Sequence, residues 1–471
     1  MSHPQEPLPA PIPRRPCALV LSYHYPPSGA IASRRLGVIV SLLRDAGLEV
    51  LVVSRFGDSP IAFGNEIAPG VWAFRVADPP KILLNTLVVL KRWLSHTLKD
   101  RREPTPPPNP APAPSSALRS LLRPVRTAIF ALVLALDPHK RWSLHAYRVA
   151  FSAARNHNVQ IVVTSGPPFS AVLAGTLVAR RLNKPHLLDV RDPLVAGWCD
   201  PLPRIRLATW FYGHIEAWMI RRAAKLTCAS PGIVQALTDA FPESASKFEL
   251  VMNGFDGAIR PAPSTTNHRL DILYAGSLYV GRNPFPFLEA LETLLQEPGI
   301  DASRITVRFI GHCESFRDHR LADWLRGRRS EAIVEVRPPV SEAELLPLAE
   351  QATVLLNLAQ GQQNQVPAKT FEHLASGREV LALCEADSDT GRLLDSVTGA
   401  IRIEPNDSAG LVNALRGLYR RHVIEGIPRA LPIEQVQGYS RQSQNKRFIN
   451  ALNSAMHQQR PHHLDHGKPL P

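Results

Sequence analysis

The sequence lacks the features that mark several well-defined classes of protein. It has only five cysteines, far apart and without a CxxC pair, which argues against a disulfide framework or a zinc site and is typical of a reducing compartment. No apolar run of about 18 residues or more occurs, so no ordinary membrane span is expected. Residues 1–16 are Pro-rich without an apolar core, so we expect a disordered tail and no secretory signal. The cysteines are Cys17, Cys199, Cys228, Cys313 and Cys384.

The chain also lacks the sequence marks of two classes of ligand. The GxGxxG fingerprint is absent, which argues against an NAD enzyme. No RNA- or DNA-binding motif stands out, and the basic residues are not interleaved with aromatic ones, so nucleic acid is not an expected partner. The net charge of +13 nevertheless favours an anionic partner, such as a phosphorylated substrate or an acidic membrane surface.

Length and periodicity predict two α/β domains. The 471 residues are too many for one ordinary core, and apolar, β-rich runs alternate with helical patterns almost from end to end. Short apolar strands separated by helices imply parallel strands with crossover connections, which is the doubly wound, Rossmann-like class. The strands expected first are Ala18–Tyr23, Val50–Ser54, Ile161–Ser165, His186–Val190 and Lys225–Ser230, with helices at Ser33–Ala46, Phe169–Leu182 and Arg204–Ala224.

The same pattern then repeats, which predicts a second Rossmann-like domain. A linker rich in Pro, Ser, Thr and Asn separates the two series. The second series predicts strands at Asp271–Ala275, Ile305–Ile310, Ile333–Val336, Thr353–Leu358, Glu379–Leu383 and Ala400–Ile403. A last helix, about Ser440–Met456, is expected to pack back on the N-terminal domain. The boundaries expected are 1–16 (tail), 17–258 (N-terminal domain), 259–269 (linker), 270–432 (C-terminal domain), 433–456 (crossing helix) and 457–471 (disordered tail).

A basic, Pro-rich insert at 81–136 interrupts the first series. Lys81–Lys99 and Ser116–Leu136 are basic, apolar helix patterns, and the seven prolines of Pro104–Pro114 separate them. Such segments can lie in a membrane interface, where each Lys or Arg adds about 1 kcal/mol near anionic lipid. Two helices packed on the domain, with their arginines facing water, explain the pattern equally well.

Three loops of the first series directly follow the carboxyl ends of predicted strands. Ligands of parallel sheets bind at these strand ends. The first loop holds Gly29, with Arg34 in the following helical turn, and backbone N–H groups there can approach a phosphate. The second holds Ser165 within TSGPPFS, and a tight turn stiffened by prolines would explain it as well. In the third, DVRDP, either Asp189 and Arg191 form a structural ion pair or Asp192 faces a substrate.

Two segments of the second series carry the strongest pattern. YAGSLYVGR places Gly276 and Ser277 just after a strand, and Arg282 is suited to bidentate hydrogen bonds with a diphosphate. In VPAKTFEHLASG, Lys369 and Glu372 share one helix face, so a cation can meet phosphate while a carboxylate meets ribose hydroxyls. The purely structural explanations are that Arg282 is a surface arginine and that Lys369 and Glu372 form a surface salt bridge.

Together these motifs resemble glycosyltransferase family 4 and its GT-B fold, most of all the branch that makes bacterial exopolysaccharides and lipopolysaccharides. The resemblance implies two Rossmann-like domains facing each other across a cleft, with 17–258 as the acceptor domain and 270–432 as the nucleotide-sugar domain. The resemblance implies a retaining hexosyltransferase with catalytic Asp192, Arg282 and Glu372, and no cofactor or metal beyond the nucleotide-sugar. The implied acceptor is lipid-linked or a glycan, and the implied location is cytoplasmic, peripheral on the inner membrane. The donor-binding residues implied are Gly29, Gly276, Ser277, Arg282, Asn364, Lys369 and Glu372, with Arg34, Ser165 and Arg191 on the acceptor side.

Two residues depart from the family pattern. Asn364 stands where the family has an acidic residue, and it hydrogen-bonds hydroxyls without supplying a carboxylate. Ser277 stands where the family often has an arginine, a loss for which Lys369 is a candidate compensation. A nucleotide-sugar epimerase of the same fold and a non-catalytic binding or scaffold protein are the alternatives.

Overall fold

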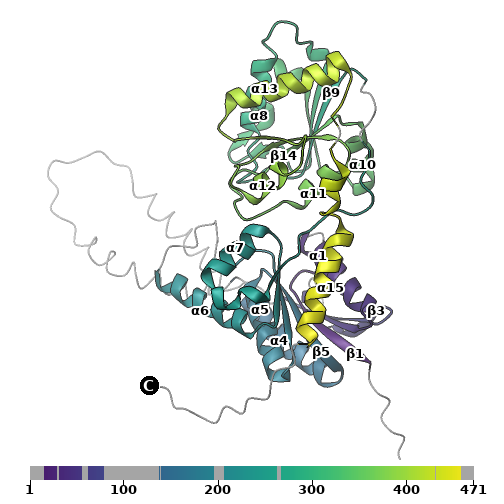
Figure 1. Cartoon of the computed structure of the whole chain (residues 1–471), viewed down its shortest axis with the longest axis vertical. Helices are drawn as coiled ribbons and strands as arrows, with labels where there is room; N and C mark the ends of the chain where they lie inside the picture. The colour runs from purple at the N-terminus through teal and green to yellow at the C-terminus, as the bar shows by residue number, and fades with distance from the viewer. Residues whose placement is uncertain are drawn as a thin grey trace, which may run out of the picture. The chain divides into compact units, whose positions relative to one another are not determined.

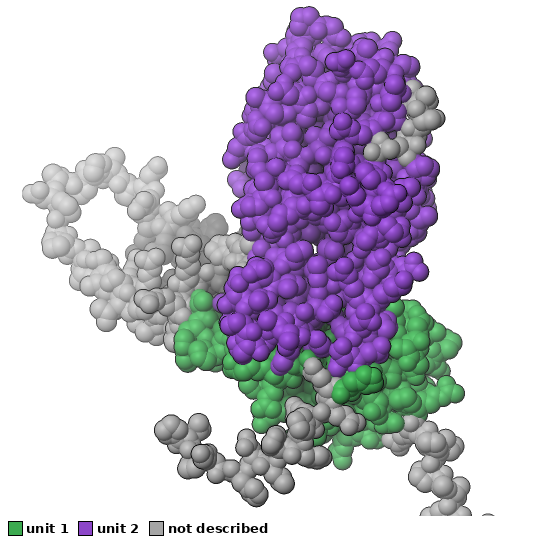
Figure 2. Space-filling model, viewed as in Figure 1, with its two compact units in different colours: residues 1–189, 200–224, 455–471 green, residues 190–199, 225–454 purple. Residues whose placement is uncertain are grey.

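The computed structural model describes residues 15–28, 31–55, 62–78, 137, 139–195, 206–261, 267–429 and 431–457. Gly29, the insert 81–136 and the outer parts of both tails lie outside the described residues, so the predictions made for them stay predictions. The chain divides into two compact units, which Figure 2 colours separately. The first comprises residues 1–189, 200–224 and 455–471, and the second residues 190–199 and 225–454.

The first sheet has eight strands in the order β3-β4-β2-β1-β5-β6-β7-β8. β1 pairs in parallel with β2 and β5, β2 with β4, and β7 with β8, whereas β3 runs antiparallel to β4. The strands are β1 Pro16–Leu21, β2 Glu49–Arg55, β3 Ala62–Ala68, β4 Val71–Val76, β5 Asn158–Gly166, β6 His186–Val190, β7 Lys225–Cys228 and β8 Phe248–Leu250. The helices are α1 Ile31–Asp45, α4 Lys140–Arg155, α5 Phe169–Leu182, α6 Arg206–Arg222 and α7 Pro231–Ala240. β7, α7 and β8 belong to the second unit.

The central strands of this sheet are apolar on both faces because helices cover both. Residues 18–21 of β1 and 50–53 of β2 are fully buried, so these strands read as continuous apolar runs. On one face, Trp142, Ala146 and Ala150 of α4 pack in one core with strand side chains. This arrangement explains why the apolar runs of the sequence predicted β1 and β2.

The second sheet has six strands in the order β13-β10-β9-β14-β15-β16, all parallel. In chain order this is 3-2-1-4-5-6, the doubly wound arrangement, with its reversal between β9 and β14. The strands are β9 Leu270–Ala275, β10 Ile305–Ile310, β13 Val334–Arg337, β14 Val354–Leu358, β15 Glu379–Leu383 and β16 Ile401–Ile403; Ser315–Phe316 (β11) and His319–Arg320 (β12) form a small hairpin.

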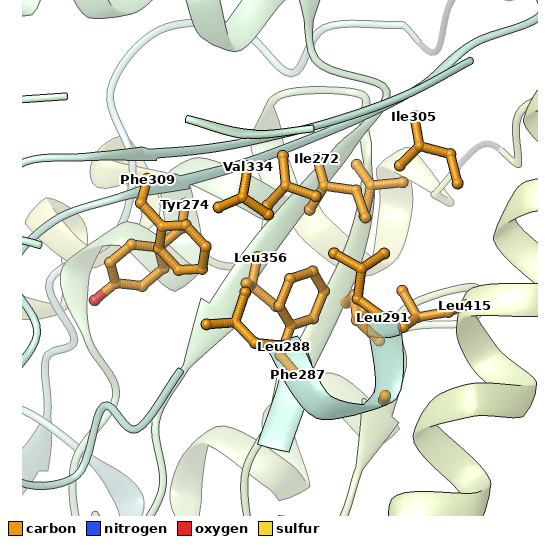
Figure 3. Close-up of a cluster of buried hydrophobic side chains, with 14 of the residues drawn as sticks. Ile272, Tyr274, Phe287, Leu288, Leu291, Ile305, Phe309, Val334, Leu356 and Leu415 are labelled. Atoms are coloured by element: carbon orange, nitrogen blue, oxygen red, sulfur yellow. The ribbon is translucent and has the colours of Figure 1, made fainter. Parts of the chain in front are cut away.

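Helices cover the second sheet on both faces. α8 and α13, which lie side by side in Figure 1, enclose the core cluster drawn in Figure 3. α10 covers Leu273 and Leu355 on the opposite face, and α11 and α12 cover Val380 and Ala382 there. The helices are α8 Phe285–Leu294, α9 Leu321–Leu325, α10 Glu342–Gln351, α11 Ala368–Ala375, α12 Asp389–Asp395, α13 Ser408–Tyr419, α14 Ile433–Gln437 and α15 Arg441–His457. Short helical segments are η1 Pro242–Lys247, η2 Ala302–Arg304, η3 Arg329–Ala332 and η4 Arg420–Glu425.

The α/β class with parallel, doubly wound sheets is therefore confirmed. Outside the insert 81–136, each strand and helix range expected from the sequence is matched by an element whose ends differ by three residues or fewer. The hairpin of β3 and β4 was not predicted, and it is the antiparallel exception in the first sheet. The predicted domain boundaries and the packing of the last helix on the N-terminal domain stay predictions.

Candidate anion-binding site

The candidate site lies where the order of strands reverses in the second sheet. β9 and β14 are neighbours there, and their carboxyl ends point to the same edge. The loop after β9 leads to α8, and the loop after β14 leads to α11. Ligands of doubly wound sheets bind at this crevice, because the two loops diverge toward opposite faces.

Two glycines allow the backbone at this edge to come close together. Gly276, just after β9, has φ +150°, and Gly311, just after β10, has φ +129°. A Cβ on Gly311 would lie 2.0 Å from the carbonyl oxygen of Gly276, so no larger residue fits without a backbone shift. Because of this close approach, the backbone of Gly276 lies against Gly311 at the strand ends.

Two cationic side chains from different loops converge on Gly276. A Cβ built there would lie 3.5 Å from Lys369 Nζ and 3.7 Å from Arg282 Nη1. Lys369 comes from the first turn of α11, and Arg282 comes from the loop after β9. The two sequence segments with the strongest predicted role therefore meet at one point.

The ammonium group of Lys369 is buried without a hydrogen-bond acceptor among the described residues. Its Nζ lies 3.9 Å from the centroid of the Tyr274 ring, a cation–π contact. Burial first, and then the neighbouring Arg282, hold the pKa of Lys369 well below its ordinary value, while Cys313 and Glu372 act in the opposite direction. A bound anion would supply the missing acceptor.

Arg282 is also left with an unsatisfied donor. Its Nε is buried and has no acceptor within the described part of the chain. The guanidinium lies 4.4 Å from the centroid of the Tyr279 ring, and that ring is itself 49% exposed. Tyr274, the ring that Lys369 contacts, donates its hydroxyl to the carbonyl of Ser277 at 3.0 Å and packs beside Phe309 in the core (Figure 3).

The carboxylate of Glu372 is exposed on α11, one turn after Lys369. The residue after it, His373, is buried, and burial together with Lys369 lowers the pKa of its imidazole to about 3. His373 is therefore neutral at physiological pH and adds no positive charge beneath the site. The exposed charge on α11 is the carboxylate of Glu372.

Asn364 lies against the start of α7. Its Oδ1 is 2.6 Å from the position that a Cβ on Gly232 would take, and its carbonyl oxygen accepts from Ser230 Oγ at 2.7 Å. The expected contact of Asn364 with a donor stays a prediction.

Asp192 lies beside the loop that follows β14. Its Oδ1 accepts a hydrogen bond of 2.6 Å from Gln365 Nε2. Burial raises the pKa of Asp192, while Arg191 and the bond from Gln365 lower it. This carboxylate is joined to the same unit as Arg282 and Lys369, since residues 190–199 belong to the second unit.

In the first unit, one predicted residue, Ser165, binds the buried carboxylate of Asp189. Arg35 forms a buried ion pair with Asp189, with Nη2 2.7 Å from Oδ1, and Ser165 Oγ donates to the same carboxylate at 2.8 Å. The ion pair of Asp189 is thus made with Arg35, where the sequence had suggested Arg191 as one possibility. Arg34 is exposed and Arg191 is half-buried.

Of the predicted residues, the structure thus brings together Gly276, Ser277, Arg282, Lys369 and Glu372. Asp192 and Asn364 make their contacts with Gln365 and with the start of α7. Sequence reasoning missed the aromatic residues Tyr274 and Tyr279 as partners of the cations. It also missed the glutamines of the loop after β14, for which a Gln-rich stretch between strand and helix was the available signal. In the ranges that the structure describes, no group of three or more His, Cys, Asp or Glu side chains is arranged to hold a metal ion. None of the described helices has both the length and the apolar character needed to cross a bilayer.

No protein-family profile matches the chain, and no curated protein matches it. Solved structures do match over nearly its whole length. Anabaena HepE in complex with UDP has a TM-score of 0.56 at 13% identity, over 93% of this chain and 100% of that one. The E. coli trehalose-6-phosphate synthase bound with UDP-2-fluoro glucose has a TM-score of 0.56 at 12% identity, over 94% and 99%. The lipopolysaccharide outer core galactosyltransferase WaaB, in its apo form, has a TM-score of 0.53 at 13% identity, over 93% and 99%. The fold of the chain is accordingly that of GT-B glycosyltransferases, with two Rossmann-like domains.

Proposed function

We propose that the chain is a glycosyltransferase that takes its sugar from a nucleotide-sugar. The observation that carries the proposal is the pair of buried, unsatisfied cationic donors, Arg282 Nε and Lys369 Nζ, at the reversal point of the second sheet. The GT-B fold adds support, because two of the structures with this fold hold UDP or a UDP-sugar. The diphosphate of the donor is the anion that these two cations fit.

Departure of a nucleoside diphosphate builds negative charge on its oxygens as the sugar–oxygen bond breaks. Arg282 and Lys369 are positioned from separate loops before the substrate arrives, so they stabilise this charge most in the transition state. Loss of one charge-assisted hydrogen bond costs about 1.5–3 kcal/mol, or roughly ten- to a hundred-fold in rate. Lys369 thereby supplies the second cation that the family has at the position of Ser277.

Two carboxylates complete the proposed site. Glu372, exposed one helical turn from Lys369, would accept hydrogen bonds from the ribose hydroxyls. Asp192, beside Gln365, would face the transferred sugar. Retention of the anomeric configuration and independence from a metal are parts of the proposal that rest on the resemblance to family 4.

The acceptor we propose is lipid-linked or a glycan, as in the exopolysaccharide and lipopolysaccharide branch that the motifs resemble. The similarity to a lipopolysaccharide galactosyltransferase agrees with that branch. The net charge of +13 and the insert 81–136 support a cytoplasmic protein bound peripherally to an anionic inner membrane. Flotation with anionic liposomes tests this part: absence of binding, or equal binding after removal of residues 81–136, contradicts it.

A thermal-shift screen against UDP-, GDP-, ADP- and dTDP-sugars tests donor binding. A donor at about a hundred times its dissociation constant stabilises the protein by about 2.7 kcal/mol. Arg282→Ala and Glu372→Ala should each lower the affinity for that nucleotide-sugar, whereas the control Lys446→Met, at an exposed position, should leave it unchanged. Product analysis with and without a glycan acceptor then separates transfer from epimerisation, because an epimerase changes the sugar without an acceptor.

A non-catalytic binding protein is the second candidate, and the placement of Asn364 favours it. The side chain of Asn364 lies against Gly232 at the position where the family has an acidic residue. Donor binding without turnover, unchanged by Arg282→Ala and Glu372→Ala, would support this candidate over the enzyme.

A further inference from the structure

The loop that carries Arg282 is held by side-chain amides from the loop after β14. Gln360 is 8% exposed and makes two hydrogen bonds with the backbone of Asn283. Its Nε2 donates to Asn283 O at 2.8 Å, and its Oε1 accepts from Asn283 N at 3.2 Å. Gln362 Nε2 donates to Gly281 O at 3.2 Å. The backbone is therefore fixed on both sides of Arg282.

The contact is too tight for a side chain on Gly281. Gly281 has φ +86°, and a Cβ there would lie 2.7 Å from Gln360 O and 3.2 Å from Gln362 Nε2. Backbone of one loop thus touches backbone of the other, and the amides close the remaining hydrogen bonds. A shift of either loop would move Arg282 relative to Lys369.

The glutamine loop is itself anchored on the far side. Gly361 N donates to both carboxylate oxygens of Glu385 at 3.0 Å, and Gln363 Nε2 donates to Asp387 O at 2.9 Å. Glu385 and Asp387 follow β15, the next strand of the sheet. The loop after β14 is consequently a rigid bridge from β15 to the Arg282 loop.

We propose that Gln360 and Gln362 are positioning residues that hold Arg282 at the diphosphate, an inference that rests on the proposed function. Arg282 has a long side chain, and its ring contact with Tyr279 is solvent-exposed, so the backbone clamp supplies the fixed origin from which the guanidinium reaches the anion. Preorganised donors are effective because they need no reorganisation when charge develops. An amide is required at 360, because only an amide donates to Asn283 O while it accepts from Asn283 N.

The test measures the affinity of UDP and UMP by calorimetry for the full-length chain. Gln360→Leu should lower the affinity for UDP roughly ten-fold and leave the affinity for UMP unchanged, because UMP lacks the second phosphate. Gln362→Leu, which loses one hydrogen bond, should have a smaller effect in the same direction. Gln442→Leu, at an exposed glutamine of α15 outside both loops, is the matched control, and it should bind both nucleotides as the wild type does.

A double variant separates positioning from damage to the fold. In an Arg282→Ala background, Gln360→Leu should cause no further loss of UDP affinity, because its effect passes through Arg282. Additive losses, an equal loss of UMP affinity, or unchanged UDP affinity in Gln360→Leu would each overturn the inference. If the wild type prefers GDP, ADP or dTDP, the same comparison is made with that nucleotide and its monophosphate. If the wild type binds none of the four diphosphates, the proposed function is wrong and the inference falls with it.

Discussion

Replacement of Lys369 by methionine should change stability and ligand response in opposite directions. In the chain without ligand, the ammonium is buried and without an acceptor among the described residues. Burial of an unpaired ion costs several kcal/mol after relaxation, and the contact with Tyr274 returns about 2 kcal/mol of that. Methionine has a similar length and no charge, so Lys369→Met should stabilise the ligand-free protein by about 1–3 kcal/mol.

The same substitution should remove most of the stabilisation by UDP. For the wild type at about a hundred times the dissociation constant, bound ligand adds about 2.7 kcal/mol. Loss of a charge-assisted hydrogen bond weakens binding roughly ten- to a hundred-fold, so the same UDP concentration adds only about 0.4–1.4 kcal/mol to the variant.

Thermal unfolding with and without UDP measures both effects. Each kcal/mol shifts the midpoint by about 2–4 °C in domains of this size. Lys446→Met, an exposed lysine on α15, is the matched control and should leave both midpoints unchanged. A lower midpoint for Lys369→Met without ligand would refute the reasoning about burial. An undiminished UDP shift in that variant would refute the assignment of Lys369 to the anion.

The difference in stability between the wild type and Lys369→Met should depend on pH, because the pKa of Lys369 is lowered in the folded chain. Between that lowered pKa and the ordinary lysine value, the unfolded chain binds more protons than the folded chain, so stability rises with pH. The stability gap between wild type and Lys369→Met should therefore narrow as the pH rises toward the ordinary lysine pKa, and UDP binding should weaken because it requires the ammonium form. A gap that widens with pH contradicts this sign. The groups that face Lys369 are Arg282, Tyr274, Cys313, Glu372 and His373.

Three further outcomes are expected from other parts of the structure. Gly311→Ala should reduce UDP affinity by forcing a shift of Gly276, measured by calorimetry, with Gly299→Ala as a control at an open position of positive φ. Arg35→Met should destabilise the chain by about 3–5 kcal/mol in urea unfolding, because it leaves Asp189 buried without its cation. Burial raises the pKa of Glu379, but hydrogen bonds from His422 and Arg421 outweigh it and lower this pKa to about 2, so its contribution to stability is present above the ordinary pKa and lost as the pH falls toward 2. Acid unfolding of Glu379→Gln should accordingly be shallower than that of the wild type over this range.

The sequence predicted the strands well because both sheets are covered on both faces. Residues 18–21 and 50–53 must be apolar throughout, and such runs stand out between helical patterns. β3 and β4 were missed because Val71–Val76 mixes buried and half-buried residues next to the edge strand β3, where a continuous apolar run is not required. Burial on both faces is therefore what made a strand visible in the sequence.

The site was predictable in part for a similar reason. Arg282 and Lys369 follow strand ends, and strand order alone brings the loops of β9 and β14 together. The partner of Asp189 was not predictable, because Arg35 lies 154 positions away along the chain and the nearer Arg191 suits the same charge. The Gln-rich stretch is visible in the sequence, but the role of Gln360 and Gln362 was not predictable, since it depends on contacts with the backbone of Asn283 and Gly281.

The contrast of Arg35 with Arg282 and Lys369 decides between a structural and a ligand-binding role for these basic side chains. Arg35 is nearly fully buried, and its Nε and Nη2 both donate to Asp189, which is how a structural cation is satisfied. Arg282 Nε and Lys369 Nζ are buried without any such acceptor in the described parts of the chain, and they lie near the same glycine. Two buried basic nitrogens without acceptors, Arg282 Nε and Lys369 Nζ, destabilise the protein unless an anion is bound for part of its working cycle. A fold that satisfies Arg35 fully and leaves this pair unsatisfied at the strand reversal of β9 and β14 is organised around a negatively charged ligand.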